Sequence, residues 1–352
     1  MKDEMMLKAI ELLTKLIETP SFSKEEEETA KIIEDWFLEF EIECKRNGNN
    51  VWVTNKYYDT KKPTILLNSH HDTVKPNKAY RNNPFEAKVE KGKLYGLGSN
   101  DAGGALVGLM SLFVHFYKQK DLKYNLLFAG TAEEEISGIN GISSILNLMP
   151  PIDFAVVGEP TEMQLAISEK GLLVIDAYAT GVSGHAAHDN TENSIYKALR
   201  DISWIESYSF PKTSSTLGKV KMSVTQINAG TQHNVVPADC HFVIDVRVND
   251  VYQNQEIFEI IKKHTGCHMK ARSFRLNSSC IDSNHPIVKA GVSLGRETYG
   301  SPTISDQALL TCPSLKLGPG KSSRSHSADE FILLSEIKEG ISLYIDIFNE
   351  IL

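Results

Sequence analysis

The sequence predicts an α/β fold with a mixed sheet, interrupted by an inserted α+β domain. Helical and strand patterns alternate through residues 1–169, long alternating strands begin near Lys170, and the helix–strand alternation returns after Ser278. The chain has 352 residues, which is longer than one hydrophobic core commonly grows. We therefore expect one domain built from residues 1–169 and 279–352, with residues 170–278 inserted into it.

The first segment is expected to begin with two helices. Residues 5–17 repeat apolar side chains at helical spacing. Residues 23–40 follow, with Ser23 as the N-cap and Glu26 placed to complete a capping box. Short apolar runs that end at turn residues predict strands, and an apolar run opened by glycines predicts a third helix. These elements are strands at 50–54, 64–68, 124–128 and 154–158, and a helix at 103–116.

The inserted segment has the order strand, helix, strand, strand, helix, strand, which is typical of a ferredoxin-like α+β domain. The strands are expected at 172–180, 219–227, 240–248 and 269–274, and the helices at 194–205 and 252–264. The last segment returns to the first pattern, with a helix at 286–298, a strand at 314–317 and a closing helix at 334–348.

Composition excludes several classes of function. The chain carries 45 acidic and 37 basic side chains, a net charge of −8, so it offers no basic surface for nucleic acid. Residues 1–10 carry four charged side chains, whereas a secretory signal needs a continuous apolar core. No apolar run is long enough for a membrane span. The five cysteines are odd in number and far apart, which argues against a disulfide framework and favours a reducing cytoplasm.

Residues of the kind that bind metals concentrate in short segments just beyond strands or at turns, where open α/β sheets place their sites. The segments are NSHHDTV (68–74), GLGSNDAGG (96–104), GTAEEEISG (130–138), VGEPTE (157–162) and SRSHSADE (323–330). Alternation along a strand places His70 and Asp72 on one face and His71 on the other.

Each segment also has an ordinary structural interpretation. Asp101 is a competent helix N-cap, although Ser99 or Asn100 could cap instead. Consecutive acids such as Glu133, Glu134 and Glu135 can form a solvated turn, Glu159 can be an exposed turn acid, and His326 a solvated loop histidine. Their joint occurrence favours a mixed nitrogen and oxygen site of the kind that zinc accepts.

These five segments, in this order, resemble the two-zinc amidohydrolases and exopeptidases, a family that includes acetylornithine deacetylase, succinyl-diaminopimelate desuccinylase, glutamate-releasing carboxypeptidase and aminoacylase. The resemblance covers essentially the whole chain, including the inserted segment. It implies a zinc-exopeptidase type of catalytic domain with an inserted lid and dimerisation domain. It also implies two divalent cations, expected to be Zn²⁺ with Co²⁺ as the alternative.

Carried over to this sequence, the resemblance assigns His70 and Glu159 to one metal, Glu135 and His326 to the other, and Asp101 to both. Asp72 would orient His70, and Glu134, immediately before the metal-binding acid, would be the general base. Sequence alone does not distinguish the roles of Glu133, Glu134 and Glu135. The implied reaction is attack of an activated water on an amide carbonyl, which yields an acid and an amine.

The resemblance also assigns residues in the inserted segment. His185 in GVSGHAAH would reach the active site of a partner subunit, which implies a homodimer. Asn234 would contact the substrate, and Arg247 would bind a substrate carboxylate because a guanidinium can bond both oxygens at once. His188 matches no pattern and is expected at the surface. Without the resemblance, these residues are equally consistent with structural roles.

Departures from the common family pattern affect the choice of substrate and leave the expected ligands intact: Ala102 and two glycines follow Asp101, and His71 replaces a frequent threonine. We expect acetylornithine, or a relative such as succinylornithine or acetylcitrulline, as the substrate in arginine or lysine biosynthesis. Arg324 is a candidate contact for a second acidic group. The alternatives are a small-peptide exopeptidase and a catalytically inactive binding protein.

Overall fold

The computed structural model describes residues 2–352, and side chains from residue 4 onward. The described chain divides into two compact units. Of the described residues, the first contains 2–167, 280–299 and 305–352, and the second contains 168–279 and 300–304. The short segment 300–304 belongs to the second unit, although the sequence analysis placed it in the closing segment.

A mixed sheet organises the first unit, as the sequence predicted. The central strands β6 (Asn125–Thr131), β3 (Thr64–His70), β7 (Phe154–Val157) and β17 (Ser314–Lys316) are parallel neighbours. Antiparallel strands flank them. The full order is β1 (Lys45–Asn47), β2 (Asn50–Thr54), β6, β3, β7, β17, β8 (Leu165–Glu169) and β15 (Ser279–Cys280), with β16 (Thr298–Ser301) paired to β8.

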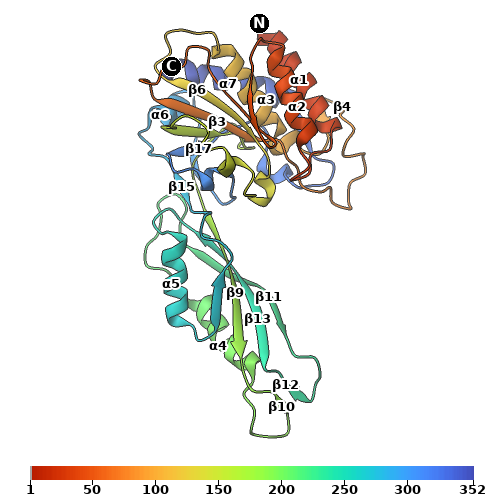
Figure 1. The fold of residues 1–352 in the computed structure, drawn as a ribbon, viewed down its shortest axis with the longest axis vertical. Helices are drawn as coiled ribbons and strands as arrows, with labels where there is room; N and C mark the ends of the chain where they lie inside the picture. Colours follow the sequence, from red (N-terminus) through yellow and green to blue (C-terminus); the bar gives the residue numbers. More distant parts are fainter. Residues whose placement is uncertain (1) are drawn as a thin grey trace. The chain divides into compact units, whose positions relative to one another are not determined.

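Alternating side chains of the sheet build a separate apolar cluster on each of its faces. Ile65 and Leu67 of β3 belong to the large core shared with the helices, whereas Leu66 packs in a smaller cluster with Ile142 and Ile145. Figure 1 shows the helices gathered against the sheet. They are α1 (Lys2–Glu18), α2 (Glu27–Leu38), α3 (Gly104–Phe116), α6 (Pro286–Ser293) and α7 (Leu334–Ile351).

The second unit is an antiparallel sheet with two helices, in the predicted strand–helix–strand–strand–helix–strand order. The sheet order is β11, β13, β9, β14, and its buried side chains form their own core with α4 and α5. A short pair, β10 (Gly184–His185) with β12 (Val235–Val236), lies outside this sheet. The elements are β9 (Gly171–Thr180), α4 (Ser194–Ser207), β11 (Lys221–Ala229), β13 (Asp239–Val248), α5 (Asn254–His264) and β14 (His268–Ala271).

Several helix boundaries differ from the prediction, and two of the differences have a clear physical reason. Helix α2 begins at Glu27, and Ser23 does not cap it, because the Ser23 hydroxyl donates to Asp72 instead. Helix α6 ends at Ser293, because Gly295 takes a left-handed conformation (φ 78°) and the chain continues into β16. The sequence analysis did not predict the short sheet of β4 (Lys88–Glu90), β5 (Lys93–Tyr95) and β18 (Phe331–Leu333).

The described chain contains neither a disulfide nor a membrane-crossing helix. None of the five cysteines forms a disulfide. No helix among residues 2–352 combines the length and apolar character that crossing a bilayer requires.

Candidate metal centre

The candidate metal centre lies at the edge of the sheet where its parallel strands end. Strand β3 ends at His70, β6 ends at Thr131 just before the three glutamates, and Glu159 follows β7. Asp101 precedes α3, and His326 lies in the loop before β18. Because parallel strands present their carboxyl ends at one edge of the sheet, residues far apart in sequence meet there.

The ring of His70 is held with one nitrogen facing the other donors. Its Nδ1 lies 2.9 Å from the carbonyl oxygen of Asp72 and donates to it, so Nε2 is the nitrogen that faces the other donors and would bind a metal. The residue is buried, and among the described residues Nε2 has no hydrogen-bond partner. This nitrogen lies 3.4 Å from Asp101 Oδ1 and 3.9 Å from Glu159 Oε1.

Asp72 connects His70 to the turn that carries the glutamates. Its carboxylate accepts hydrogen bonds from the Ser23 hydroxyl (2.7 Å) and from the backbone N–H groups of Glu134 (3.0 Å) and Glu135 (3.2 Å). Burial alone would raise the pKa of Asp72, but the hydrogen bond and charge of His70 bring that pKa below its ordinary value. Asp72 therefore orients the imidazole and the glutamate turn together.

The three consecutive glutamates have different partners. Glu133 adopts a left-handed backbone (φ 54°), and its carboxylate accepts from the Asn140 side chain (2.9 Å) and backbone N–H (3.2 Å). Glu134 Oε2 lies 3.9 Å from His70 Nε2, and Glu135 Oε2 lies 2.9 Å from His326 Nε2. The turn thus directs Glu134 and Glu135 toward the two histidines and Glu133 away from them.

Within residues 4–352, nitrogen and oxygen donors form two groups that share one carboxylate. In each group the donor atoms lie within 4.8 Å of one another. Asp101 belongs to both groups, and its Oδ2 lies 3.6 Å from His326 Nε2. The structure therefore brings together all the residues for which the sequence analysis predicted metal ligation: His70, Asp101 and Glu159 in one group, and Asp101, Glu135 and His326 in the other.

The electrostatics of these groups fit divalent cations. Burial and neighbouring carboxylates raise the pKa of Glu134 well above its ordinary value. Burial and the charge of Asp101 raise the pKa of Glu159 to about 8. Such crowded carboxylates cannot all ionise unless positive charge is supplied, and a dication supplies it. The unpartnered His70 Nε2 and the mixed nitrogen and oxygen donors suit zinc or a similar ion.

The sequence analysis did not predict that two further acids, Glu330 and Asp306, are buried around the centre. Glu330, 2% exposed, accepts hydrogen bonds from the backbone of the Asp101 loop, and burial raises its pKa to about 8. Asp306 accepts from the Thr131 hydroxyl (2.6 Å), and burial raises its pKa to about 6. Glu330 stands four residues after His326, a visible signal, whereas nothing in the sequence near Asp306 indicates burial beside the site.

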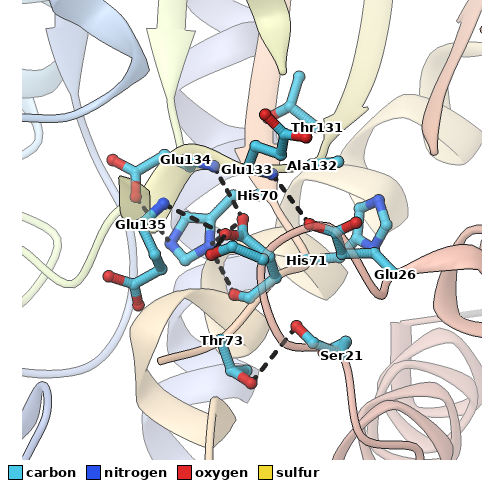
Figure 2. A network of polar contacts seen from close by, with 12 residues as sticks. Ser21, Glu26, His70, His71, Thr73, Thr131, Ala132, Glu133, Glu134 and Glu135 are labelled. Atoms are coloured by element: carbon cyan, nitrogen blue, oxygen red, sulfur yellow. Dashed lines mark hydrogen bonds and ion pairs between the residues drawn. The ribbon is translucent and has the colours of Figure 1, made fainter. Parts of the chain in front are cut away.

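His71, whose role the sequence left open, is a structural residue. Its Nδ1 lies 2.9 Å from the Thr29 hydroxyl and its Nε2 lies 2.9 Å from the Asn49 carbonyl oxygen. Burial lowers its pKa to about 4, so the ring is neutral near pH 7. Figure 2 shows His71 on the side of Glu26, away from Glu134 and Glu135, as strand alternation predicts.

The residues predicted in the inserted segment lie in the second unit. His185 is exposed in β10, and its Nδ1 accepts from the Ala187 N–H (3.1 Å). Asn234 lies just before β12, where its carbonyl accepts from the Ala186 N–H. The guanidinium of Arg247 is paired with Asp245 of the same strand, at 2.8 and 3.1 Å. Their catalytic and substrate roles stay predictions.

Arg324 is also paired. Its guanidinium bonds both carboxylate oxygens of Glu336 at the start of α7 (2.7 and 3.0 Å) and lies over the Phe331 ring. A bidentate pair of this kind holds the loop that carries His326 against α7. The predicted contact between Arg324 and a substrate acid therefore requires the pair to open.

Two donor groups sharing a carboxylate, at the carboxyl edge of a mixed α/β sheet, define a metal-dependent hydrolase. The chain belongs to the peptidase family M20/M25/M40, whose model matches residues 66–350. This is the kind of family that the sequence segments indicated.

The relatives and structural neighbours agree with this assignment. Succinyl-diaminopimelate desuccinylase of Rickettsia bellii is 26% identical over 375 residues, covering 97% of this chain and 96% of that protein. Aminopeptidase PepT of Bacillus cereus shares the fold with a TM-score of 0.77 at 16% identity, covering 98% of both chains. A dinuclear metal binding peptidase of Bacillus subtilis gives a TM-score of 0.73 at 18% identity, covering 99% of this chain and 98% of that one.

We expect metal loading to release protons at pH 7. The hydrogen bond to Glu135 raises the pKa of His326 to about 9, and the pKa of Glu159 is about 8, so both groups hold protons in the metal-free protein. Ligation requires both to be deprotonated. Calorimetric titration in buffers of different ionisation enthalpy should show net proton release at pH 7 that shrinks as the pH rises toward 9. Heats independent of the buffer would contradict these ligand assignments.

Proposed function

We propose that the chain hydrolyses the amide bond of an N-acyl amino acid, with two divalent cations held by the donor groups that share Asp101. The observation that carries this proposal is the position of Glu134, whose carboxylate lies 3.9 Å from His70 Nε2 yet belongs to neither donor group. A mostly buried acid beside a candidate metal centre, outside both donor groups, is suited to proton transfer.

Each group has a separate role in the proposed reaction. When bound, the cations polarise the amide carbonyl and the attacking water and stabilise developing negative charge. Glu134 accepts the proton of the water and returns it to the leaving amine. Asp72 keeps His70 in the tautomer that presents Nε2, and its bonds to the glutamate turn hold Glu134 in place. Zinc is the proposed metal, with cobalt as the alternative.

The proposed substrate changes in the light of the relatives. The sequence analysis favoured acetylornithine as the substrate, in arginine or lysine biosynthesis, whereas the relatives covering nearly the whole chain are named succinyl-diaminopimelate desuccinylases. We therefore propose an N-succinylated diamino acid, as in lysine biosynthesis, ahead of acetylornithine. A cytoplasmic enzyme fits such a reaction, and five cysteines without a disulfide fit a reducing compartment.

The test is turnover of a substrate panel by protein loaded with zinc or cobalt. The panel contains succinyl-diaminopimelate, succinylornithine, acetylornithine and acetylcitrulline, together with dipeptides and tripeptides. We expect the highest kcat/KM for a succinylated diamino acid. A preference for free peptides would support the exopeptidase alternative. Peptides are included because a tripeptidase of Staphylococcus aureus shares the fold. Binding of two ions without turnover of any compound would support a binding protein.

A homodimer remains part of the proposal. His185 is exposed on β10 in the second unit, a position from which it can meet another molecule. Sedimentation analysis tests the dimer, and we expect His185→Asn to lower kcat without dissociating it. Active monomers would remove this part of the proposal.

We expect Arg324→Ala to reduce stability by about 1 kcal/mol, because it breaks a mostly buried bidentate pair with Glu336. Thermal unfolding measures this effect. The ratio of succinyl to acetyl turnover tests the predicted substrate contact at the same time. A ratio equal to that of the unaltered chain would leave Arg324 with the structural role only.

A further inference from the structure

Glu330 is a buried carboxylate that faces the backbone of the loop carrying Asp101. It is 2% exposed and directly precedes β18. Its Oε1 accepts the N–H groups of Asn100 (2.8 Å) and Asp101 (2.9 Å), and its Oε2 accepts the N–H of Gly98 (3.2 Å). Its backbone carbonyl also accepts the N–H of Gly96 (3.0 Å). One residue thus binds most of the amides between residues 96 and 101.

The Asp101 loop depends on such a partner because its backbone is irregular. Gly98 has a left-handed conformation (φ 75°), and Asp101 has non-helical angles (φ −121°, ψ 97°) just before α3. Amides in such a loop lack the partners that a helix or strand would supply, and leaving them buried and unpaired is costly. The two oxygens of one carboxyl group can satisfy several of them.

This loop supplies the one carboxylate common to both donor groups. We infer that Glu330 is a positioning residue, which fixes the Asp101 loop in its metal-binding conformation before a cation arrives. The inference rests on the two-metal site of the proposed function. It also connects the two sides of the centre, because Glu330 and His326 lie on the same short segment.

A carboxyl group is required at position 330 because of the number of hydrogen-bond donors that face it. Three N–H donors converge on the two oxygens of Glu330, and a carboxyl group can accept at both oxygens, whether ionised or carrying one proton. In a glutamine of the same size, the amide nitrogen would face at least one backbone N–H, donor against donor. Glu330→Gln therefore removes part of the loop's anchorage while keeping the volume of the side chain.

The first experiment is a metal titration of the metal-free protein. Zn²⁺ is titrated against a chromophoric chelator, and we expect Glu330→Gln to weaken binding by about 10–100-fold. The matched control is Asp329→Asn. The carboxylate of Asp329, next to Glu330 in the sequence, also accepts backbone N–H groups, but these belong to Arg81 and Asn82 and not to the Asp101 loop. That variant should bind zinc within about twofold of the unaltered chain.

Hydrogen exchange on the unaltered chain gives an independent test that does not require the variant to fold. In the metal-free protein the amides of Asn100 and Asp101 should already be protected, and Glu330→Gln should speed their exchange by about tenfold or more. Rapid exchange in the metal-free unaltered chain would overturn the inference. Unweakened zinc binding by a folded Glu330→Gln would do the same. Failure of the unaltered chain to bind two ions would instead remove the proposed function.

Discussion

Glu134→Gln is expected to lower kcat by about a hundredfold to ten-thousandfold, the usual contribution of a positioned general base. The change keeps the size of the side chain but removes the carboxylate that takes the proton from water. Because Glu134 belongs to neither donor group, the variant should still bind two ions. Steady-state kinetics together with metal analysis of the same samples measures both effects.

The neighbouring Glu133 offers a matched control. It is also buried, but its carboxylate is bound to Asn140. Glu133→Gln should leave kcat near that of the unaltered chain and lower stability by about 1 kcal/mol through the weakened bond. If Glu133→Gln abolished turnover while Glu134→Gln did not, the assignment of the base would be wrong.

Asp101→Asn is expected to damage both metal positions at once. Asp101 is the shared member of the two donor groups, and an amide supplies one neutral oxygen in place of two charged ones. Changes outside the ligand shell already cost about 10–100-fold in metal affinity, so losing the shared ligand should cost more than this. Metal analysis after gel filtration should find one ion or none, with kcat reduced accordingly.

Asp35→Asn is the control for the change of charge. Asp35 pairs with Lys31 on the exposed face of α2, and its loss should alter neither metal content nor kcat. An Asp101→Asn protein that retains two tightly bound ions would show that the donor groups do not share a ligand.

The sequence was sufficient to predict the strands that bring the candidate ligands together. Strand β2 occupies residues 50–54 as predicted, and the apolar runs of β3, β6 and β7 end within three residues of their predicted ends. Donor side chains that follow such strands meet at one edge because parallel strands align their carboxyl ends. Alternation also separated His70 from His71, since that property depends only on neighbouring residues.

Contacts between distant segments could not be predicted from local patterns. Ser23 has the residue type of an N-cap, but Asp72 lies within reach only after folding, and the hydroxyl bonds it instead. The predicted substrate role of Arg247 came from the family resemblance, and that of Arg324 from its residue type and its place near His326. In the structure, Asp245 and Glu336 pair with their guanidinium groups. A local pattern carries no information about which acid an arginine will meet.

The sequence by itself determined which residue types are available for metal chemistry and at which strand ends they stand, because both properties are local. Only the tertiary structure distinguished Glu133 from Glu134 and Glu135, and only it placed Glu330 against the loop of Asp101. That contact joins positions 229 residues apart. Such a contact forms because the folded chain must satisfy its buried amides, a requirement that no single segment reveals.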